Sequence, residues 1–309
     1  MIIVTGGLGF IGKNIVNQIN SSLKKEVIIV DKPKAKILKN NKYLNNLIFL
    51  KKLKNKNFAK KIRFIFHQGA NSNTAEKNFS SIMLDNFFYT EELISLCEKF
   101  DIPLIYASSA SVYGRDTRIF SEREKLNPSN YYAISKSLID LLVEKKIKKN
   151  KKLKIIGLRY FNVYGPGEER KKRMASVFYH FNKQLKNQSF IKLFKGTDGY
   201  KNGEQKRDFV HVYDCVNINL FFFKKFKSGI YNVGSGIATT FNLIAKNICN
   251  ASKKKFKIKY IDMPNDILDG YQNYTKANIT KLRKAGYTAK FIPIKIGSMK
   301  YSNQKTFIL

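Results

Sequence analysis

Hydrophobic positions in the first two-thirds of the chain alternate between two kinds of segment. Short continuous apolar runs, rich in β-branched and aromatic residues, are typical of buried parallel strands. These runs are Ile2–Val4, Val27–Val30, Phe64–Phe66, Leu104–Tyr106 and Ile155–Leu158. Helix-like segments lie between them, near residues 11–22, 81–99 and 130–148. Strands that alternate with helices predict an α/β fold with a Rossmann-type doubly wound parallel sheet.

The last third has a different pattern. After Gly165-Pro166-Gly167 the chain is loop-rich, until strand-like runs at 209–212 and 230–233 suggest a return to the first domain. We therefore expect a second, smaller α+β domain built from separated pieces. The predicted nucleotide-binding domain comprises residues 1–166 and 206–238, and the predicted substrate-binding domain comprises residues 167–205 and 239–309. Residues 32–60 are too weakly periodic to predict an element.

A glycine-rich turn follows the first predicted strand. Gly6, Gly9 and Gly12 form a G-x-x-G-x-x-G run that leads into the first predicted helix. Glycine permits a tight turn and lets backbone N–H groups approach a pyrophosphate, which then faces the N-terminus of the helix. The run therefore predicts a dinucleotide site.

The same residues allow a second interpretation. Gly7 to Lys13 fits the P-loop pattern, but the next residue is Asn14, where a P-loop has a hydroxyl for Mg²⁺. Asp31 ends the second strand, about 20 residues past the glycines, where a carboxylate can bond the adenosine ribose. That position favours a dinucleotide, and an acid there favours NAD. Lys32 and Lys39 follow and could hold the 2′-phosphate of NADP, so the choice of cofactor stays open.

Three residues predict alcohol–carbonyl redox chemistry. Tyr132 and Lys136 are spaced Y-x-x-x-K, which places both side chains on one face of a helix. A neighbouring ammonium is expected to lower the pKa of the phenol, which is otherwise a poor base at neutral pH. Ser109 ends a predicted strand, where open α/β sheets bind ligands. Hydride transfer with tyrosine as acid and base follows from this set.

The net charge of +36 points toward nucleic acid or an anionic membrane. The excess is nearly all lysine, in runs scattered over 51–61, 145–154 and 253–259. Phe and Tyr are abundant and Trp is absent, a pattern that fits A/T-rich codons better than a binding surface. We predict no nucleic-acid or membrane partner, and keep a nucleic-acid-binding module as the alternative of a different class.

Cysteine spacing and the N-terminal sequence indicate whether the chain binds a metal and where in the cell it is expected. The three cysteines stand far apart, with no spacing for a disulfide framework or a zinc site. The chain starts without the basic and apolar regions of a signal peptide, and its longest apolar stretch is too short to span a bilayer. These features predict no metal and a cytoplasmic location.

Together with Arg159 to Pro166 (Arg-Tyr-Phe-Asn-Val-Tyr-Gly-Pro), the glycine run, Ser109 and the Tyr132/Lys136 pair resemble the extended short-chain dehydrogenase/reductase family, the NAD-dependent epimerases and dehydratases of nucleotide sugars. The resemblance covers nearly the whole chain and is weakest at 32–60 and after about residue 288. It implies that Phe10, Ile11, Gln68, Gly69, Ala70, Asn71, Ser72, Asn86, Lys136 and Val163 lie beside the cofactor, together with Gly6, Gly9, Gly12, Asp31, Lys32 and Lys39.

Within this family, the 4,6-dehydratases carry an Asp-Glu pair after the catalytic Ser or Thr, where this chain has Ala110-Ser111. Residues 159–180, 192–194, 206–210 and 271–272 instead closely resemble the ADP-L-glycero-D-manno-heptose 6-epimerases, whose product enters the inner core of lipopolysaccharide. UDP-hexose 4-epimerases are the alternative. The resemblance implies NADP, with NAD as the other candidate, an ADP-heptose substrate and self-association, which the family suggests is a homopentamer.

The chemistry that this resemblance implies is transient oxidation at C6 of the sugar, with return of the same hydride to the opposite face. Tyr132 then serves one face, and Lys171, which also contacts the cofactor, serves the other. The implied substrate contacts are Ser109, Asn162, Arg173, His180, Phe194, Lys195, Gly196, Thr197, Arg207 and Tyr271. For Arg207, which can fork a diphosphate, a salt bridge with Asp208 is the structural alternative.

The chain departs from the family pattern at several places. Arg173 stands where small residues are usual, Asn71 replaces a usual Cys, and the loop from Thr197 to Arg207 is longer than typical. The segment from Phe291 to Leu309 looks eroded. Because Ser109, Tyr132, Lys136 and Lys171 are all present, we expect a retained active site; a decayed pseudoenzyme is the alternative.

Overall fold

The computed structural model describes residues 1–23, 27–32, 42–115, 118, 120–252, 256–268 and 271–302. The chain forms two compact units, each assembled from separated segments. Unit 1 consists of Met1–Val112, Asn130–Arg159 and Val216–Tyr231, and unit 2 consists of Tyr113–Ser129, Tyr160–Cys215 and Asn232–Leu309. The domain limits expected from the sequence stay predictions.

A seven-stranded sheet is the centre of unit 1 in the described part of the chain, with the order β10-β6-β5-β4-β1-β2-β3. The strands are β1 Ile2–Thr5, β2 Val27–Asp31, β3 Lys42–Asn45, β4 Phe64–His67, β5 Leu104–Ser109, β6 Ile155–Tyr160 and β10 Gly229–Val233. The pairs from β5 to β3 are parallel. This sheet confirms the predicted α/β, Rossmann-type fold class.

The strand order reverses between β1 and β4, and this reversal positions the candidate cofactor site. From β1 the chain runs outward to β2 and β3, then returns and continues outward on the other side from β4. Thr5 and His67 pair at the carboxyl ends of the two strands. Open α/β sheets bind ligands beyond such a switch point, so the residues that follow, Gly6 and Gln68, lie at the expected place.

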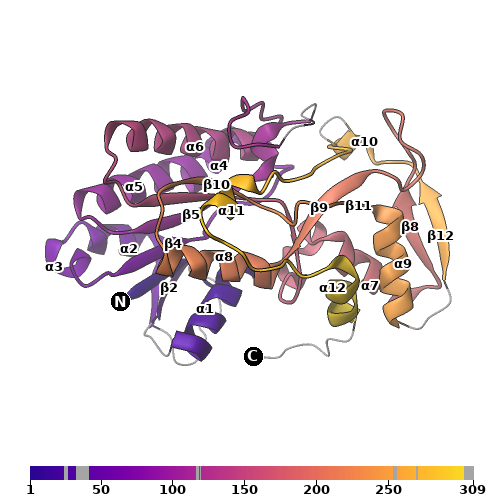
Figure 1. The fold of residues 1–309 in the computed structure, drawn as a ribbon, viewed down its shortest axis with the longest axis horizontal. Coiled ribbons are helices and arrows are strands. Elements are labelled where there is room, and N and C mark those ends of the chain that lie inside the picture. Colours follow the sequence, from indigo (N-terminus) through magenta and orange to yellow (C-terminus); the bar gives the residue numbers. More distant parts are fainter. Residues whose placement is uncertain are drawn as a thin grey trace. The chain divides into compact units, whose positions relative to one another are not determined.

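Helices cover both faces of this sheet (Figure 1). On one side lie α4 (Phe79–Ile82), α5 (Tyr89–Lys99) and α6 (Tyr131–Lys149), and on the other lie α1 (Phe10–Leu23) and α8 (Val212–Lys224). A π-helical turn, η1 (Met83–Phe88), joins α4 to α5. The unpredicted region before β4 forms β3, α2 (Asn46–Leu53) and α3 (Lys56–Ala59). Apolar side chains such as Ile3, Ile65 and Ile94 are fully shielded between sheet and helices, as parallel strands require.

Unit 2 is built on two small sheets among its described residues, ordered β11-β9-β7 and β12-β8. The strands are β7 Asn162–Tyr164, β8 Phe190–Phe194, β9 Lys206–His211, β11 Ala238–Thr240 and β12 Lys257–Ile261. The helices are α7 Val177–Asn187, α9 Phe241–Ser252, α10 Asn265–Leu268, α11 Thr280–Lys284 and α12 Ile294–Ser302, with the 3₁₀ turn η3 Glu169–Met174. A further 3₁₀ turn, η2 (Ala110–Tyr113), lies where the chain passes from unit 1 to unit 2. The strand-like run at 209–212 therefore does not return to the large sheet, because β9 pairs with β7 and β11.

The C-terminal segment, whose sequence looks eroded against the family pattern, is folded as far as residue 302. Here α12 is an ordered helix that packs on α9 and α7. Gly297 lies so close to the hydroxyl of Tyr164 that no side chain would fit. Tyr164 in turn stacks on Phe178, with 3.8 Å between ring centroids. The end of the described chain is thus part of the core of unit 2.

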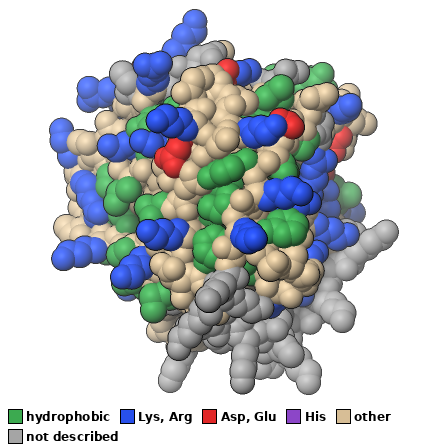
Figure 2. Space-filling view, turned by 90° about the vertical axis from the view of Figure 1, so that its right-hand side faces the viewer, with side chains coloured by type: hydrophobic (Ala, Val, Ile, Leu, Met, Phe, Trp, Pro, Cys, Tyr) green, Lys and Arg blue, Asp and Glu red, His purple; other side chains and the backbone are tan. Residues whose placement is uncertain are grey.

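The positive charge is dispersed where it can be seen. Figure 2 shows Lys and Arg side chains scattered over one face, separated by polar and apolar surface, rather than joined in a stripe. Over the part of the chain that the structure describes, no helix is long and apolar enough to cross a bilayer.

Candidate active site

The glycine turn has the geometry that its sequence predicts. Gly6 has φ +63° and its N–H donates to the carbonyl of Val30 at 2.7 Å. A Cβ at Gly6 would lie 2.5 Å from the nitrogen of Gly69, so only glycine fits between the ends of β1 and β4. Phe10 and Ile11 then begin α1, with Gly9 and Gly12 in the turn and first helical turn. The N-terminus of α1 thus follows a turn in which Leu8, which is buried, has the only side chain among residues 6–9.

Asp31 braces this turn. Its carboxylate accepts the N–H of Leu8 at 2.9 Å and the N–H of Lys32 at 2.8 Å. The exposed ammonium of Lys32 forms an ion pair with Asp85 at 2.8 Å. Lys39 lies outside the described residues. Of the candidate 2′-phosphate ligands, the described one is therefore already paired, while Asp31 stands where a ribose-binding acid is expected.

The loop after β4 completes the candidate cofactor cradle. Buried Oε1 of Gln68 has no hydrogen-bond partner in the described structure, although its Nε2 reaches Asn219 at 3.5 Å. Gly69 donates to Thr5, while Ala70 and Ser72 are exposed. A buried acceptor without a partner, beside a glycine-rich turn at the switch point of the sheet, fits a dinucleotide that brings its own donors.

Asn86, predicted to lie beside the cofactor, has its side-chain amide hydrogen-bonded to other residues of the protein. From the π turn η1 its side chain bonds the N–H of Asn71 at 2.7 Å, the carbonyl of Asn71 at 3.0 Å and the hydroxyl of Ser135 at 3.0 Å. Ser135 then donates to the carbonyl of Tyr132 at 2.8 Å. Asn86 therefore links the loop after β4 to the helix that carries Tyr132.

His67 is a structural residue, as its position at a strand end suggests. The ring is buried, with Nδ1 bonded to Thr5 at 2.5 Å and Nε2 to Thr90 at 2.8 Å. Burial, and then the nearby charge of Lys136, lower the pKa of His67 to about 3. A histidine held neutral between two hydroxyls braces β1 against α5.

Ser109, Tyr132 and Lys136 come together in unit 1. Helix α6 begins at an Asn130 cap that accepts the N–H of Ala133 at 2.9 Å, which is a common N-cap arrangement. Ser109 donates a side-chain hydrogen bond to the hydroxyl of Tyr132. The ammonium of Lys136 donates to the carbonyl of Ala107 at 2.8 Å and lies 6.0 Å from the centroid of the Tyr132 ring.

The expected lowering of the tyrosine pKa by Lys136 is wrong in this structure. Burial raises the pKa of Tyr132, and the hydrogen bond from Ser109 offsets this only in part. Burial also lowers the pKa of Lys136 to about 8, against the attraction of Asp140. The hydrogen bond with Ser109 is the interaction that favours the phenolate of Tyr132 here.

Two supporting residues escaped the sequence analysis. Ser111 donates from its hydroxyl to Oγ of Ser109 at 2.9 Å, which leaves the Ser109 proton for Tyr132. Asp140, fully buried, follows Lys136 by one helical turn and accepts from Tyr106 at 2.8 Å, Ser108 at 2.9 Å and Arg159 at 2.7 Å. An acid at i+4 from Lys136, with an arginine inside an apolar strand, was the available signal.

Lys171 lies in unit 2, in the 3₁₀ turn η3. Its side chain is half-buried; burial lowers the pKa of the Lys171 ammonium, and Glu168 acts in the opposite direction. Arg173 is exposed, and its carbonyl lies 3.3 Å from Nε2 of His180 on α7. Asn162 and Val163 lie on β7, paired with Phe209 and Val210 of β9.

Further candidate substrate residues form a second cluster in unit 2. The guanidinium of Arg207 lies 4.8 Å from the ring centroid of Tyr271, hydrogen-bonds its hydroxyl, and donates to Gln272 at 3.0 Å. Nε of Arg207 is buried without a partner in the described structure. The ring of Phe194 lies 6.1 Å from that of Tyr271. A guanidinium that lies on an aromatic ring and has an unsatisfied Nε–H donor suits an anionic ligand.

The residues after Phe194 are tied into the lengthened loop. Lys195 pairs with Asp262 at 2.9 Å, the N–H of Gly196 donates to Asn202 at 2.9 Å, and Thr197 donates to Asn273 at 3.2 Å.

The alternative salt bridge between Arg207 and Asp208 does not describe the role of Asp208. Its buried carboxylate accepts N–H groups of Ser235 at 2.7 Å, Gly236 at 2.9 Å and Ala277 at 2.9 Å. Burial raises the pKa of Asp208 to about 6 despite these donors. Asp208 therefore holds two loops of unit 2, while Arg207 faces Tyr271 and Gln272.

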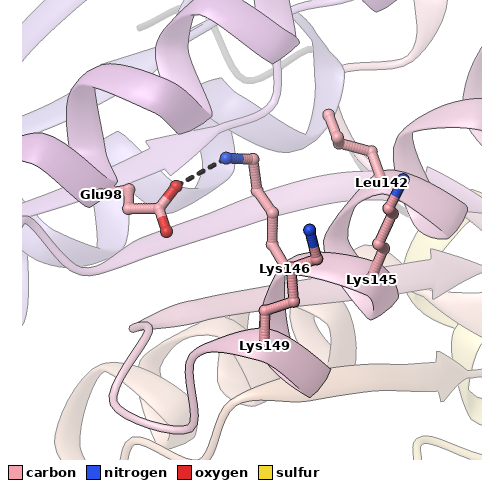
Figure 3. Close-up of a pocket in the computed structure, with 5 residues that line it drawn as sticks. All are labelled: Glu98, Leu142, Lys145, Lys146 and Lys149. Atoms are coloured by element: carbon pink, nitrogen blue, oxygen red, sulfur yellow. Dashed lines mark hydrogen bonds and ion pairs between the residues drawn. The ribbon is translucent and has the colours of Figure 1, made fainter.

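A pocket of about 260 Å³ lies elsewhere on unit 1, between α5 and α6 (Figure 3). Glu98, Leu142, Lys145, Lys146 and Lys149 line it, and Lys146 pairs with Glu98 at 2.6 Å. It contains none of the candidate catalytic groups. In the described residues, no group of three His, Cys, Asp or Glu side chains could hold a metal ion.

Comparison with known proteins places this geometry in context. The family model of the NAD dependent epimerase/dehydratase family matches residues 2–234. An ADP-L-glycero-D-manno-heptose-6-epimerase from Helicobacter pylori is similar, with 29% identity over 97% of this chain and 94% of that chain, at a TM-score of 0.82. A UDP-glucose 4-epimerase from Thermotoga maritima shares the fold, with 24% identity over 97% of each chain and a TM-score of 0.82.

Proposed function

This chain belongs to the NAD dependent epimerase/dehydratase family, and we propose that it inverts C6 of ADP-D-glycero-D-manno-heptose to give the L-glycero epimer for the lipopolysaccharide inner core. The observation that carries the redox chemistry is the hydrogen bond between Ser109 and Tyr132, with the Lys136 ammonium 6.0 Å from the ring. The heptose is supported by Lys171 in its sequence setting and by 29% identity to a heptose epimerase.

The proposed first step is removal of a proton from the C6 hydroxyl by Tyr132. Ser109 donates to the tyrosine oxygen and so stabilises its negative form, which makes the phenol a better base than its burial alone would allow. A nicotinamide cofactor, when bound, would supply reversible hydride transfer at C6. Gly6, Asp31 and Gln68 are proposed to hold that cofactor, which we take to be NADP, with NAD as the alternative.

Inversion calls for an acid and base on each face of the sugar carbon. Tyr132 serves one face, and the proposal assigns the other to Lys171. Burial lowers the pKa of the Lys171 ammonium, so proton release costs less than it would at an exposed lysine. Lys171 would then donate its own ammonium proton to the C6 oxygen on reduction of the ketone, while Tyr132 keeps the proton it removed, and the net reaction is neither oxidation nor reduction.

The nucleotide part of the substrate is assigned to the second cluster of unit 2. Buried Nε of Arg207 is a donor that a diphosphate oxygen would satisfy. The ring of Tyr271 lies against this guanidinium, and the ring of Phe194 packs edge to face on that of Tyr271. Dehydration is not expected, because Ala110 and Ser111 stand where the dehydratases carry their acid pair. Self-association and a cytoplasmic location belong to the same proposal.

The test is direct conversion. The purified protein, loaded with NADP or NAD, is incubated with ADP-D-glycero-D-manno-heptose, and C6 is followed by NMR. Appearance of the L-glycero epimer supports the proposal, and the cofactor released on denaturation identifies the nucleotide. Turnover of UDP-galactose without action on the heptose would replace the proposal by a UDP-hexose 4-epimerase.

A further inference from the structure

Glu168 is a buried acid at the centre of the loop that joins β7 to α7 in unit 2. None of its surface is exposed. Oε1 accepts the N–H of Gly165 at 3.2 Å and the hydroxyl of Ser176 at 2.8 Å, while Oε2 accepts the N–H of Ser176 at 2.5 Å. One carboxylate therefore ties together the two ends of the segment 165–176.

The same carboxylate also reaches the C-terminal helix. The hydroxyl of Tyr301 on α12 donates a side-chain hydrogen bond to Glu168. The ring of Tyr301 lies 6.3 Å from that of Phe178, on the helix that follows the loop. Gly297, one turn earlier on α12, is packed against Tyr164 at the end of β7. Residues before, after and far beyond the loop thus converge on one buried acid.

Lys172, next to Lys171, has a strained backbone. Its φ is 50° and its ψ is −118°, a region that residues with a side chain rarely adopt. Lys171 itself donates its N–H to the carbonyl of Glu168 at 2.9 Å, and Ala175 donates to the carbonyl of Lys172 at 3.1 Å. Such a conformation persists only where the surroundings over-determine it, and it is concentrated at functional sites.

Electrostatic attraction also couples Glu168 to Lys171. Glu168 is the acid whose attraction opposes the effect of burial on the Lys171 ammonium, and the positive charge of Lys171 acts back on Glu168. Acids and bases that exchange protons with a substrate must be held to within fractions of an ångström. A buried carboxylate with several donors supplies that restraint, whereas an exposed side chain would not.

We propose that Glu168 is a positioning residue: it holds the strained turn at Lys172 and the C-terminal helix together, and so orients Lys171 for its proton transfer. This inference rests on the proposed function, because it takes Lys171 as one of the two acid–base groups. It assigns to Glu168 no contact with substrate or cofactor.

The test separates the two half-reactions. Single-turnover reduction of the bound nicotinamide is followed by its near-ultraviolet absorbance with each purified ADP-heptose epimer. Lys171→Met defines which epimer needs Lys171 for its oxidation. Glu168→Gln is expected to slow that half-reaction about 10–100-fold, while oxidation of the other epimer, which depends on Tyr132, changes less than about 2-fold. Equal losses in both half-reactions, or in neither, would overturn the proposal.

A matched control and a milder variant accompany this test. Glu169→Gln removes the same charge from an exposed neighbour in the same turn and is expected to leave both half-reactions unchanged. If Glu168→Gln fails to fold, Tyr301→Phe removes only the contact from α12 and is expected to give the same one-sided loss, about 3–10-fold.

Hydrogen–deuterium exchange gives a readout that needs no turnover. Glu168→Gln is expected to speed exchange of the amides in 165–176 by about 10-fold or more, because the acceptor for Gly165 and Ser176 is weakened, whereas Lys171→Met leaves them as they are. Unchanged exchange in Glu168→Gln would refute the positioning role of Glu168. A wild-type protein inert to both epimers would reject the proposed function alone, since the exchange result stands by itself.

Discussion

The two candidate acid–base groups of this protein are held in opposite ways. Tyr132 lies on a long regular helix, capped at Asn130 and backed by a buried ion pair between Asp140 and Arg159. Lys171 lies on a short irregular turn, next to a residue with a positive φ, and is held through one buried acid. Periodic structure positions the first group, and tertiary contacts position the second.

The largest expected effect tests Tyr132, the group on the regular helix. Tyr132→Phe removes the hydroxyl that exchanges the substrate proton, so kcat for heptose inversion should fall about 10²–10⁴-fold. Tyr131→Phe is the matched control, because Tyr131 is an exposed neighbour on the same helix. Conversion is followed by NMR at C6. Equal rates for wild type and Tyr132→Phe would mean that this phenol has no role in the reaction.

The next effect concerns the support behind that helix. Asp140→Ala leaves Arg159, whose side chain is 1% exposed, without its carboxylate, and removing one partner of a buried pair costs about 3–5 kcal/mol. Denaturant unfolding measures the loss. Glu144→Ala is the control, because Glu144 is partly exposed and lies 3.9 Å from Arg159; it should cost less than about 1 kcal/mol. A small loss for Asp140→Ala would show that the pair does not stabilise α6.

How much the sequence could predict follows the same division. The glycine run and the Y-x-x-x-K pair were visible because a turn before a helix and a helix face fix the spacing of residues. Asp140 followed the same periodicity but carried no signal of its role, since its partners come from two strands. Lys171 was distinguishable from other lysines only by family resemblance, because loop spacing does not fix a side-chain direction.

The packing of the last third was harder still to predict. The run at 209–212 has the pattern of a strand, but that pattern does not tell which sheet a strand joins. Residues 291–302 looked eroded against the family pattern, and that comparison does not tell whether a segment folds. Their contacts with Tyr164 and Glu168 exist only in the folded unit. Residues 42–60 fold into β3, α2 and α3, although their lysine-rich sequence hides the period.

Buried titratable groups give the two units opposite dependences on pH. His67, in unit 1, has a pKa of about 3 in the folded protein, so the unfolded chain binds its proton first and stability is lost as pH falls below about 6.5. Asp208, in unit 2, has a pKa of about 6 in the folded protein. The folded protein therefore binds that proton first, and this contribution to stability is lost as pH rises toward 6.

Urea unfolding at pH 7 and pH 5 tests both signs. His67→Gln should reduce the loss of stability on going to pH 5, and Asp208→Asn should increase it, each by on the order of 1 kcal/mol. Shifts of the same sign in both variants would contradict the assignment of these groups.

The smallest expected effect tests backbone strain in the irregular turn that holds Lys171. Lys172→Gly removes the side chain that makes φ 50° unfavourable, and relief of such strain is worth about 1 kcal/mol after the entropic cost of glycine. Thermal unfolding should therefore show a modest gain in stability. Lys186→Gly in α7, where the backbone is helical, is the control and should lose about 1 kcal/mol. If Lys172→Gly also loses stability, the turn beside Lys171 is relaxed, and the difference between the two acid–base groups lies in their contacts rather than in backbone strain.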